Sequence, residues 1–170
     1  MPLIDTPLPE FDREMGQTRK VLDRVPDGQF DWRPHPTSVT LGRLAEHLAE
    51  MPLWATTTMA QSELDMMTPR PADYQSPTTR AAVLAMFDGH LTGARANVAG
   101  KTDGEWDAPW TLKAGGKEMF TMPKASVMRG FVLNHMVHHR GQMTVYLRML
   151  GVKIPSIYGP SGDEQAAHSR

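Results

Sequence analysis

The chain has 170 residues, of which 40% are hydrophobic and 22% are charged, and its formal net charge at pH 7 is -1. This length and composition predict a single globular domain over residues 1–170, large enough to bury a core of its own. The nearly balanced charge gives no electrostatic reason to expect nucleic acid or an anionic membrane surface as a partner.

The chain contains no cysteine, which excludes disulfides, thiolate metal ligands and a cysteine nucleophile. The first residues include acidic side chains and lack the apolar core of a signal peptide. No stretch approaches the roughly 18 consecutive apolar residues that indicate a membrane span. We therefore expect a cytoplasmic protein with no membrane partner.

Proline and glycine separate four stretches in which apolar residues recur at helical spacing. The first helix is predicted over about residues 7–25, and a proline-rich extended linker follows it. The second is predicted to begin near Ser38 or Thr40 and to continue to about Gln61. Pro52 lies inside this second helix, so we expect a kink or a local break there.

The third helix is predicted to open at Ser76 and Pro77 and to stop around Gly100. The long connection that follows contains a Gly-Gly pair between short apolar segments, which indicates a hairpin or an ordered loop. The fourth helix, from about Pro123 to Leu150, is the longest. Because strand signals are few, the pattern predicts an all-α protein built as a four-helix bundle.

Two connections are expected to interrupt a simple up-down order of the helices: the one between the first and second, and the one between the third and fourth. Gly151 follows the fourth helix directly and is expected to be its C′ residue. The polar tail from about residue 161 is expected to fray.

The segment NHMVHHRGQ, residues 134–142, holds three of the seven histidines. His135 and His139 are one helical turn apart and share a face, and apolar neighbours on that face predict that the pair points into the bundle. Zinc and nickel both accept neutral imidazole, so the spacing favours a metal site over the alternative, a hydrogen-bonded pair of core histidines. His138 is expected about 60° further around the helix, nearer the rim.

A third ligand would complete such a site, and His47, on or beside the apolar stripe of the second helix, is the best candidate. From its position alone, His47 is better explained as a hydrogen-bonded or half-exposed residue than as a metal ligand. His90 is a weaker candidate, and His35 has no helix to direct it. Glu50, one turn after His47, is either an acceptor for the histidine ring or an ordinary surface glutamate.

Several other side chains have two interpretations each. Gln142 either supports a metal-ligating histidine or packs at the edge of the core. Tyr158 either lines the mouth of a site or anchors the C-terminal segment. Arg140 and Arg148 are expected to be solvated or bound to helix ends and carboxylates. Substrate specificity would come from loops at the bundle ends, with Trp106, Trp110 and the segment SIYGPS as candidates.

Three segments carry a resemblance to a known family. NHMVHHRGQMTVYLRMLGVKIPSIYGPS resembles the last-helix signature of the DinB-like (damage-inducible, YfiT-like) metalloprotein superfamily. DWRPHPTSVTLGRLAEHLAEM resembles the second-helix region of that superfamily, and GKEMFTMPKASVM resembles its lead-in to the last helix. The resemblance implies a DinB/YfiT-type four-helix bundle with a long ordered connection before the last helix. It also implies a divalent metal, zinc or nickel, held by His47, His135 and His139, with His138 outside the ligand set.

Related enzymes of the superfamily are transferases and isomerases that use mycothiol or bacillithiol, hydrolases have been proposed, and homodimers are common. The resemblance therefore implies a metal-dependent S-transferase or hydrolase-like enzyme that acts on a small molecule, with a low-molecular-weight thiol as co-substrate. It identifies no catalytic residue. Two alternatives stay open: a non-catalytic, stress-associated bundle that binds a metal or a small ligand, and an interaction bundle without metal.

Overall fold

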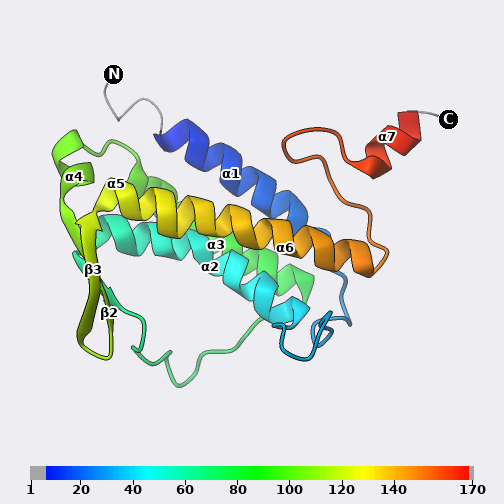
Figure 1. The fold of residues 1–170 in the computed structure, drawn as a ribbon, viewed down its shortest axis with the longest axis horizontal. Helices are drawn as coiled ribbons and strands as arrows, with labels where there is room; N and C mark the ends of the chain where they lie inside the picture. The colour runs from blue at the N-terminus through cyan, green and yellow to red at the C-terminus, as the bar shows by residue number, and fades with distance from the viewer. Residues whose placement is uncertain (1–6, 169–170) are drawn as a thin grey trace.

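Four long helical segments lie along one another, and a small sheet is attached at one end of them (Figure 1). The computed structural model describes residues 7–168. The long segments are α1 (Pro7–Leu22), α2 (Leu41–Ala60), α3 (Arg80–Val98) and a continuous helical run of α5 (Lys124–Val127), the π-helix η2 (Met128–Asn134) and α6 (His135–Met149). The shorter helices are α4 (Asp103–Asp107) and α7 (Gly162–His168).

The sheet consists of β1 (Glu63–Asp65), β2 (Pro109–Ala114) and β3 (Lys117–Pro123), in the order β1-β2-β3. The predicted hairpin is the antiparallel pair β2–β3, and β1 adds a parallel strand. Gly115 and Gly116 form the turn at φ of 62° and 79°, a conformation that glycine adopts without steric cost. The protein is therefore helix-rich with a small sheet, and the all-α prediction is only partly right.

Side-chain caps set where α2 and α3 begin. Thr40 accepts a hydrogen bond from the backbone N–H of Arg43, and Thr79 accepts one from the N–H of Ala82. The third helix thus begins three residues after the predicted opening at Ser76 and Pro77. The second helix continues through Pro52 without interruption.

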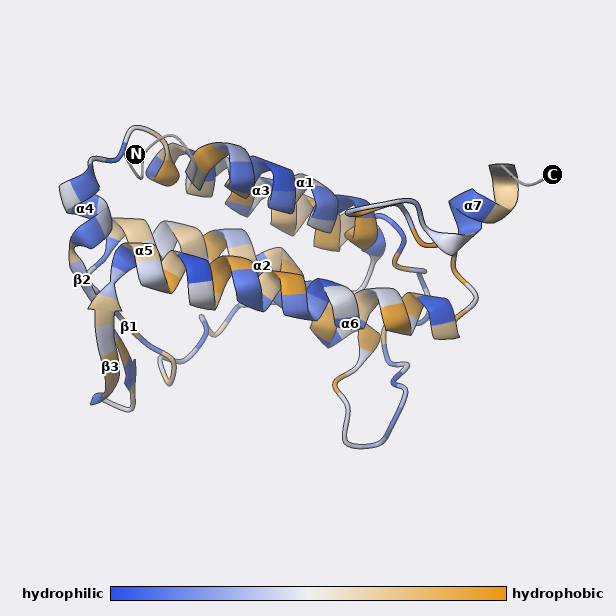
Figure 2. Ribbon diagram, turned by 45° about the horizontal axis from the view of Figure 1, so that its top comes forward, coloured by the Kyte–Doolittle hydropathy of each residue, from blue (hydrophilic) through white to orange (hydrophobic). Residues whose placement is uncertain are grey.

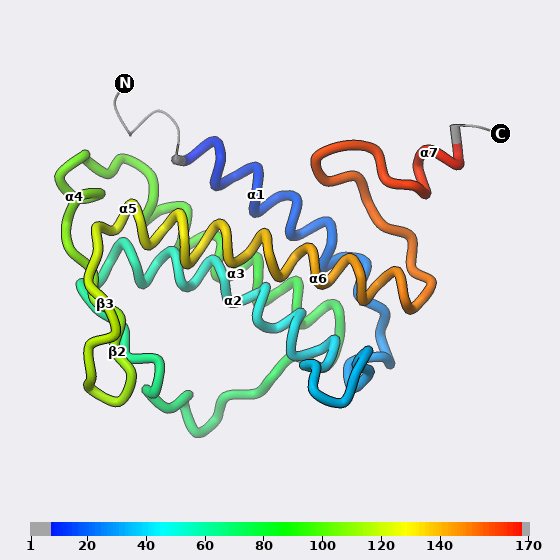
Figure 3. The backbone as a smooth tube through the Cα atoms, viewed as in Figure 1, coloured from blue at the N-terminus to red at the C-terminus, as the bar shows by residue number. Residues whose placement is uncertain are grey.

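The order of helix directions differs from the prediction. In Figures 1 and 3, α2 and α3 run in the same direction, whereas α1 and α6 run in the opposite one. Ion pairs agree with this arrangement, since Arg19 pairs with Asp88 and Arg95 pairs with Asp12 across the antiparallel helices α1 and α3. The chain between α2 and α3 must therefore return along the length of the molecule. Residues 66–79, here called the strap, make this return (Figure 3).

The four long segments share one hydrophobic cluster. Hydrophobic and hydrophilic residues are interspersed along each helix in Figure 2, as expected for amphipathic helices. α1 contributes Phe11, Met15, Val21 and Leu22 to the cluster, at spacings that keep them on one face. None of the helices in residues 7–168 combines the length and the apolar character that crossing a bilayer requires.

The last helical run ends as predicted, and a further short helix lies in the tail beyond it. Gly151 has a φ of 73°, and the N–H groups of Gly151 and Val152 bond the carbonyls of Arg148 and Leu147, which is the Schellman arrangement. Beyond it, residues 162–168 form α7, and Asp163 accepts two hydrogen bonds from Arg148. Residues 169 and 170 of the predicted tail lie outside the described residues.

Candidate metal centre

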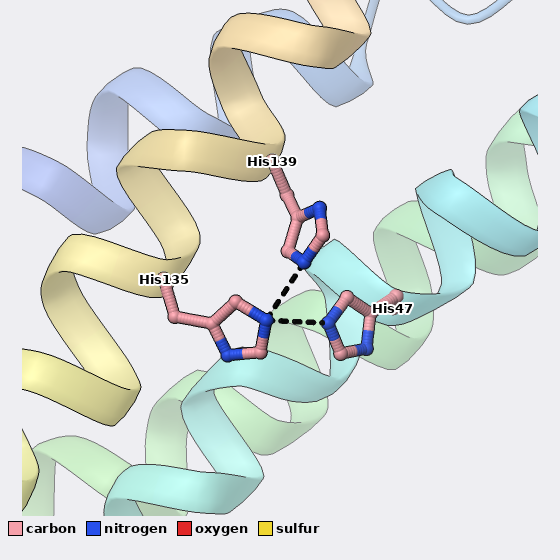
Figure 4. A group of neighbouring side chains, drawn as sticks. All are labelled: His47, His135 and His139. Carbon is pink, nitrogen blue, oxygen red and sulfur yellow. Dashed lines mark hydrogen bonds between the residues drawn. The ribbon is translucent and has the colours of Figure 1, made fainter.

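Two antiparallel helices bring the three predicted histidines together. His47 lies in the second turn of α2, His135 begins α6, and His139 follows one turn later (Figure 4). The Nε2 atom of His135 is 3.3 Å from that of His47 and 2.7 Å from that of His139. One nitrogen from each ring lies within 4.8 Å of the others.

The histidine pair does not lie on the core-facing side of α6, which corrects the prediction that it points into the bundle. The buried residues of α6 are Met136, Arg140, Met143 and Leu147, whereas His135 and His139 are half-buried on the flank that faces α2. This buried face of α6 was not recognised in the sequence, because the charged Arg140 interrupts its apolar pattern. The cluster is therefore partly exposed to solvent.

The opposite side of each imidazole has a partner of its own. The Nδ1 atom of His139 lies 2.7 Å from Oε1 of Gln142, and the ring of His135 hydrogen bonds the backbone of Phe131. The Nδ1 atom of His47 lies 4.0 Å from Oε2 of Glu50. A neutral imidazole has one N–H, so donation through Nδ1 leaves the Nε2 lone pair turned toward the cluster.

Burial keeps these rings neutral. Burial, together with the neighbouring His139 and His135, lowers the pKa of His47 to about 3. The pKa values of His135 and His139 are also lowered, in both cases chiefly by burial. The cationic side chains Arg43 and Arg70 act in the same direction on His47. Neutral imidazole is the form that ligates a metal.

The donor set fits a divalent cation. The Nε2 contacts of His135 with His47 and His139 are hydrogen bonds in which the tautomer decides the donor, and a cation bound between the rings would replace the shared protons. Nitrogens about 2.0–2.1 Å from a tetrahedral zinc ion are roughly 3.4 Å apart, so His135 and His139 would have to move slightly apart to bind one. Nickel accepts the same ligands. The three histidines would therefore hold the metal, and the solvent-facing side leaves room for a further ligand.

Trp54 belongs to the same site, although the sequence reasoning did not include it. Its ring centroid lies 6.2 Å from that of His47 and 5.8 Å from that of His135. Trp54 follows His47 by two helical turns on α2, and this spacing could have indicated it. The indole gives the histidine cluster an apolar wall.

Two carboxylates beside His47 hold the strap to α2. Glu46, which is only 3% exposed, accepts hydrogen bonds from Arg70, Tyr74 and Ser76 of the strap. Burial by itself raises the pKa of Glu46, but these hydrogen bonds outweigh it and hold the pKa below its usual value. Glu50 pairs with the other terminal nitrogen of Arg70, at 2.7 Å. The strap is thus fixed on both sides of the turn that carries His47.

The other histidines that were considered as candidate ligands do not belong to the cluster. Nδ1 of His90 bonds the backbone oxygen of Ala49, and His35 bonds Thr37 in the linker. His138 is exposed, and its ring lies in a T-shaped arrangement with that of His139, with centroids 4.9 Å apart. Among the residues that the structure describes, the metal-binding geometry involves His47, His135 and His139.

A buried polar network lies on the opposite side of the same turn of α6. Arg140 is 1% exposed and donates to the carboxylate of Glu14 at 2.7 Å, to Thr18 and to the hydroxyl of Tyr158. Tyr158 in turn donates to Glu14 at 2.7 Å. Tyr158 therefore anchors the C-terminal segment rather than lining a site. The sequence suggested a carboxylate partner for Arg140 but not its burial.

Comparisons with known proteins agree with these features. The model of the DinB family matches residues 5–169. The uncharacterized protein YrdA of Bacillus subtilis (strain 168) is 31% identical over 164 residues, which cover 96% of this chain and 92% of YrdA.

Two solved structures are similar in fold. The crystal structure of a DinB-like protein from Bacillus cereus ATCC 10987 has a TM-score of 0.66 and 25% identity, covering 89% of this chain and 95% of the other. The DinB-like protein YjoA of Bacillus subtilis has a TM-score of 0.68 at 13% identity, covering 90% and 98%, and supports the fold alone. The family match over nearly the whole chain and the identity to YrdA show that this protein belongs to the DinB family.

Proposed function

We propose that this protein is a metal-dependent enzyme that binds zinc or nickel through His47, His135 and His139. In this proposal its helices form the DinB/YfiT-type four-helix bundle, and it works as a homodimer. The observation that carries the proposal is the convergence of three imidazole nitrogens within 4.8 Å of one another. Each ring contributes a neutral nitrogen, and the cluster stays accessible from solvent.

We further propose an S-transferase or hydrolase-like reaction on a small molecule, with a low-molecular-weight thiol as co-substrate. A bound divalent metal with an open position lowers the pKa of a water or a thiol that it ligates, and so supplies a nucleophile near neutral pH. The chain has no cysteine, so a thiol nucleophile must come from outside. The half-buried indole of Trp54 offers apolar contact to a substrate or thiol held at the cluster.

The second candidate function is non-catalytic binding of a metal or a small ligand. One observation favours it: the carboxylates nearest to His47 are already occupied. Glu46 is bonded by Arg70, Tyr74 and Ser76, and Glu50 is paired with Arg70. Neither carboxylate is thus free to carry a proton during a reaction unless the strap moves.

Metal analysis of purified variants tests the ligand set. The protein with His47→Ala is expected to lose stoichiometric metal, as is the protein with His139→Ala, because two imidazoles bind far more weakly than three. His138→Ala is the matched control, since it removes an exposed neighbouring histidine outside the cluster. Retention of a full equivalent of metal by the His47→Ala protein would overturn the three-histidine site.

A screen of activity separates the two functions. The metal-loaded protein is incubated with electrophilic small molecules in the presence and absence of low-molecular-weight thiols, and thiol consumption is measured. Catalytic turnover that disappears in the His47→Ala protein supports the enzyme. Metal binding without turnover of thiol or electrophile supports the non-catalytic candidate.

A further inference from the structure

A cavity of about 440 Å³ lies away from the histidine cluster, at the end of the molecule that carries the sheet. It is open to solvent on one side and lined by α1, the C-terminal end of α3, α4 and the first turns of the last helical run. Small-molecule sites in proteins have volumes of roughly 300–1,000 Å³, so this cavity is large enough for a ligand. None of the three clustered histidines lines it.

The walls of the cavity are apolar and partly aromatic. Phe11 comes from α1, Val98 from α3, Trp106 from α4, and Met128 and Leu133 from η2, and all five side chains are otherwise buried. These walls favour a ligand that is itself largely apolar.

The rim of the cavity carries a closed ion pair. Nη1 and Nη2 of Arg129 donate to Oε1 and Oε2 of Glu10 at 2.6 and 2.7 Å. Because each group uses both of its terminal atoms for the other, neither offers an unpaired charge to a ligand. A charged molecule would therefore give up its hydration against the apolar walls without gaining a partner.

The cavity wall also includes an unusual backbone segment. Met128, Arg129, Gly130 and Leu133 belong to the π-helix η2, which ends directly before His135. A π-helical turn is less favourable than an α-helical one, and such turns are frequently found at functional sites. An added Cβ at Gly130 would meet no atom within 4 Å, so the cavity mouth is open at this residue.

We propose that this cavity is a binding site for an uncharged, largely apolar small molecule about the size of an aromatic compound with two or three rings. The site is separate from the histidine cluster, and its occupant contacts the helical run that carries His135 and His139. Binding at the cavity does not require the bound metal, so this proposal and the proposed function can fail independently.

The probe for the test is N-phenyl-1-naphthylamine, an uncharged dye with a naphthalene and a phenyl ring whose fluorescence rises in apolar surroundings. Titration of the full-length protein is expected to give saturable binding at one site. Ser126 is exposed and lies at the cavity rim, so Ser126→Trp is expected to fold normally and to weaken binding about tenfold or more by filling the space. Ser126→Ala should bind like the unmodified protein.

Two controls make the test specific. Lys20→Trp places an equally large side chain on the exposed face of α1, away from the cavity, and is expected to leave the affinity unchanged. Circular dichroism of each variant confirms its fold. Lack of saturable binding to the unmodified protein, or equal binding to the Ser126→Trp and Lys20→Trp proteins, would overturn the proposal.

The choice of an uncharged ligand is tested with the anionic dye 1-anilinonaphthalene-8-sulfonate. It should bind the unmodified protein more weakly than the uncharged dye. Glu10→Gln frees the guanidinium of Arg129 and is expected to strengthen anionic-dye binding several-fold, with little change for the uncharged dye. Tighter binding of the anionic dye to the unmodified protein would contradict the proposed ligand class.

Discussion

The Nε2 atoms of His47 and His135 lie 3.3 Å apart, although 88 positions separate the two residues in the chain. The antiparallel packing of α2 against α6 produces this contact, and Tyr146 bonding the backbone oxygen of Val39 marks the same pairing further along. His139 then joins from the next turn of α6. The candidate metal centre thus depends on how two helices align, and this alignment makes several consequences measurable.

Addition of zinc or nickel ions to metal-free protein is expected to raise its melting temperature. A ligand at one hundred times its dissociation constant stabilises the folded state by about 2.7 kcal/mol. For a chain of this size, each kcal/mol of stabilisation raises the melting temperature by roughly 2–4 °C. Differential scanning fluorimetry with and without a chelator measures the shift. The His47→Ala protein should show little of it, and an equal shift in that variant would contradict metal binding at the cluster.

Glu50→Gln is expected to weaken metal binding by only a few-fold, below the roughly ten- to hundredfold effect of a carboxylate that hydrogen bonds the distal nitrogen of a ligating histidine and so orients the ring. The nearest approach, 4.0 Å from Oε2 of Glu50 to Nδ1 of His47, is long, and Arg70 competes for the same carboxylate. Competition titration with a chromophoric chelator measures the affinity. Glu63→Gln, which alters an exposed ion pair with Lys113, is the control. An unchanged affinity would mean that Glu50 only binds Arg70 of the strap and does not support His47.

Acidification is expected to destabilise the metal-free protein below about pH 6.5, the ordinary pKa of histidine. Burial holds the pKa of His47 near 3 and also lowers those of His135 and His139. On acidification, these histidines therefore bind protons in the unfolded chain before they do so in the folded chain. Stability falls with decreasing pH by up to about 1.4 kcal/mol per pH unit for each such histidine, until the folded-state pKa is reached. Urea denaturation at several pH values measures this slope. It should be shallower in the His47→Ala protein, and identical slopes would contradict the lowered pKa.

Arg140→Met is expected to destabilise the fold by about 3–5 kcal/mol, because it leaves the buried carboxylate of Glu14 without its buried cationic partner and with only the exposed Arg13. The double variant Arg140→Met with Glu14→Leu should recover a large part of this loss, since both charges are then removed. Arg148→Met is the matched control: its pair with Asp163 is largely solvent-exposed and should contribute about 1 kcal/mol or less. Chemical denaturation measures all three, and equal losses at Arg140 and Arg148 would contradict the role of burial.

The helices and the histidine pair could be predicted because their signals are local. Caps such as Thr40, the turn glycines Gly115 and Gly116, and the C′ residue Gly151 act within a few residues of their own position. The four-residue spacing of His135 and His139 places both on one helical face whatever surrounds it. The family resemblance then directed attention to His47, which spacing alone left undecided.

Other features could not be predicted because they depend on partners far along the chain. The strand β1 has only three residues and exists through its pairing with β2, nearly fifty positions later. Trp106 was a candidate for substrate specificity, and the structure places it in the wall of a cavity distant from the histidines. The π-helix η2 left no signal that periodicity detects.

The sequence by itself determined the helical segments, the turn residues and the shared face of His135 and His139, since backbone propensity and side-chain spacing are properties of neighbouring residues. Only the tertiary structure decided that His47 meets that pair, that the pair lies on the flank of α6 and that Arg140 occupies the core instead. A charge such as that of Arg140 is stable in the interior only where folding supplies its partner, here Glu14 from the first helix. The side that α6 turns to the core is therefore set jointly by residues from both ends of the chain.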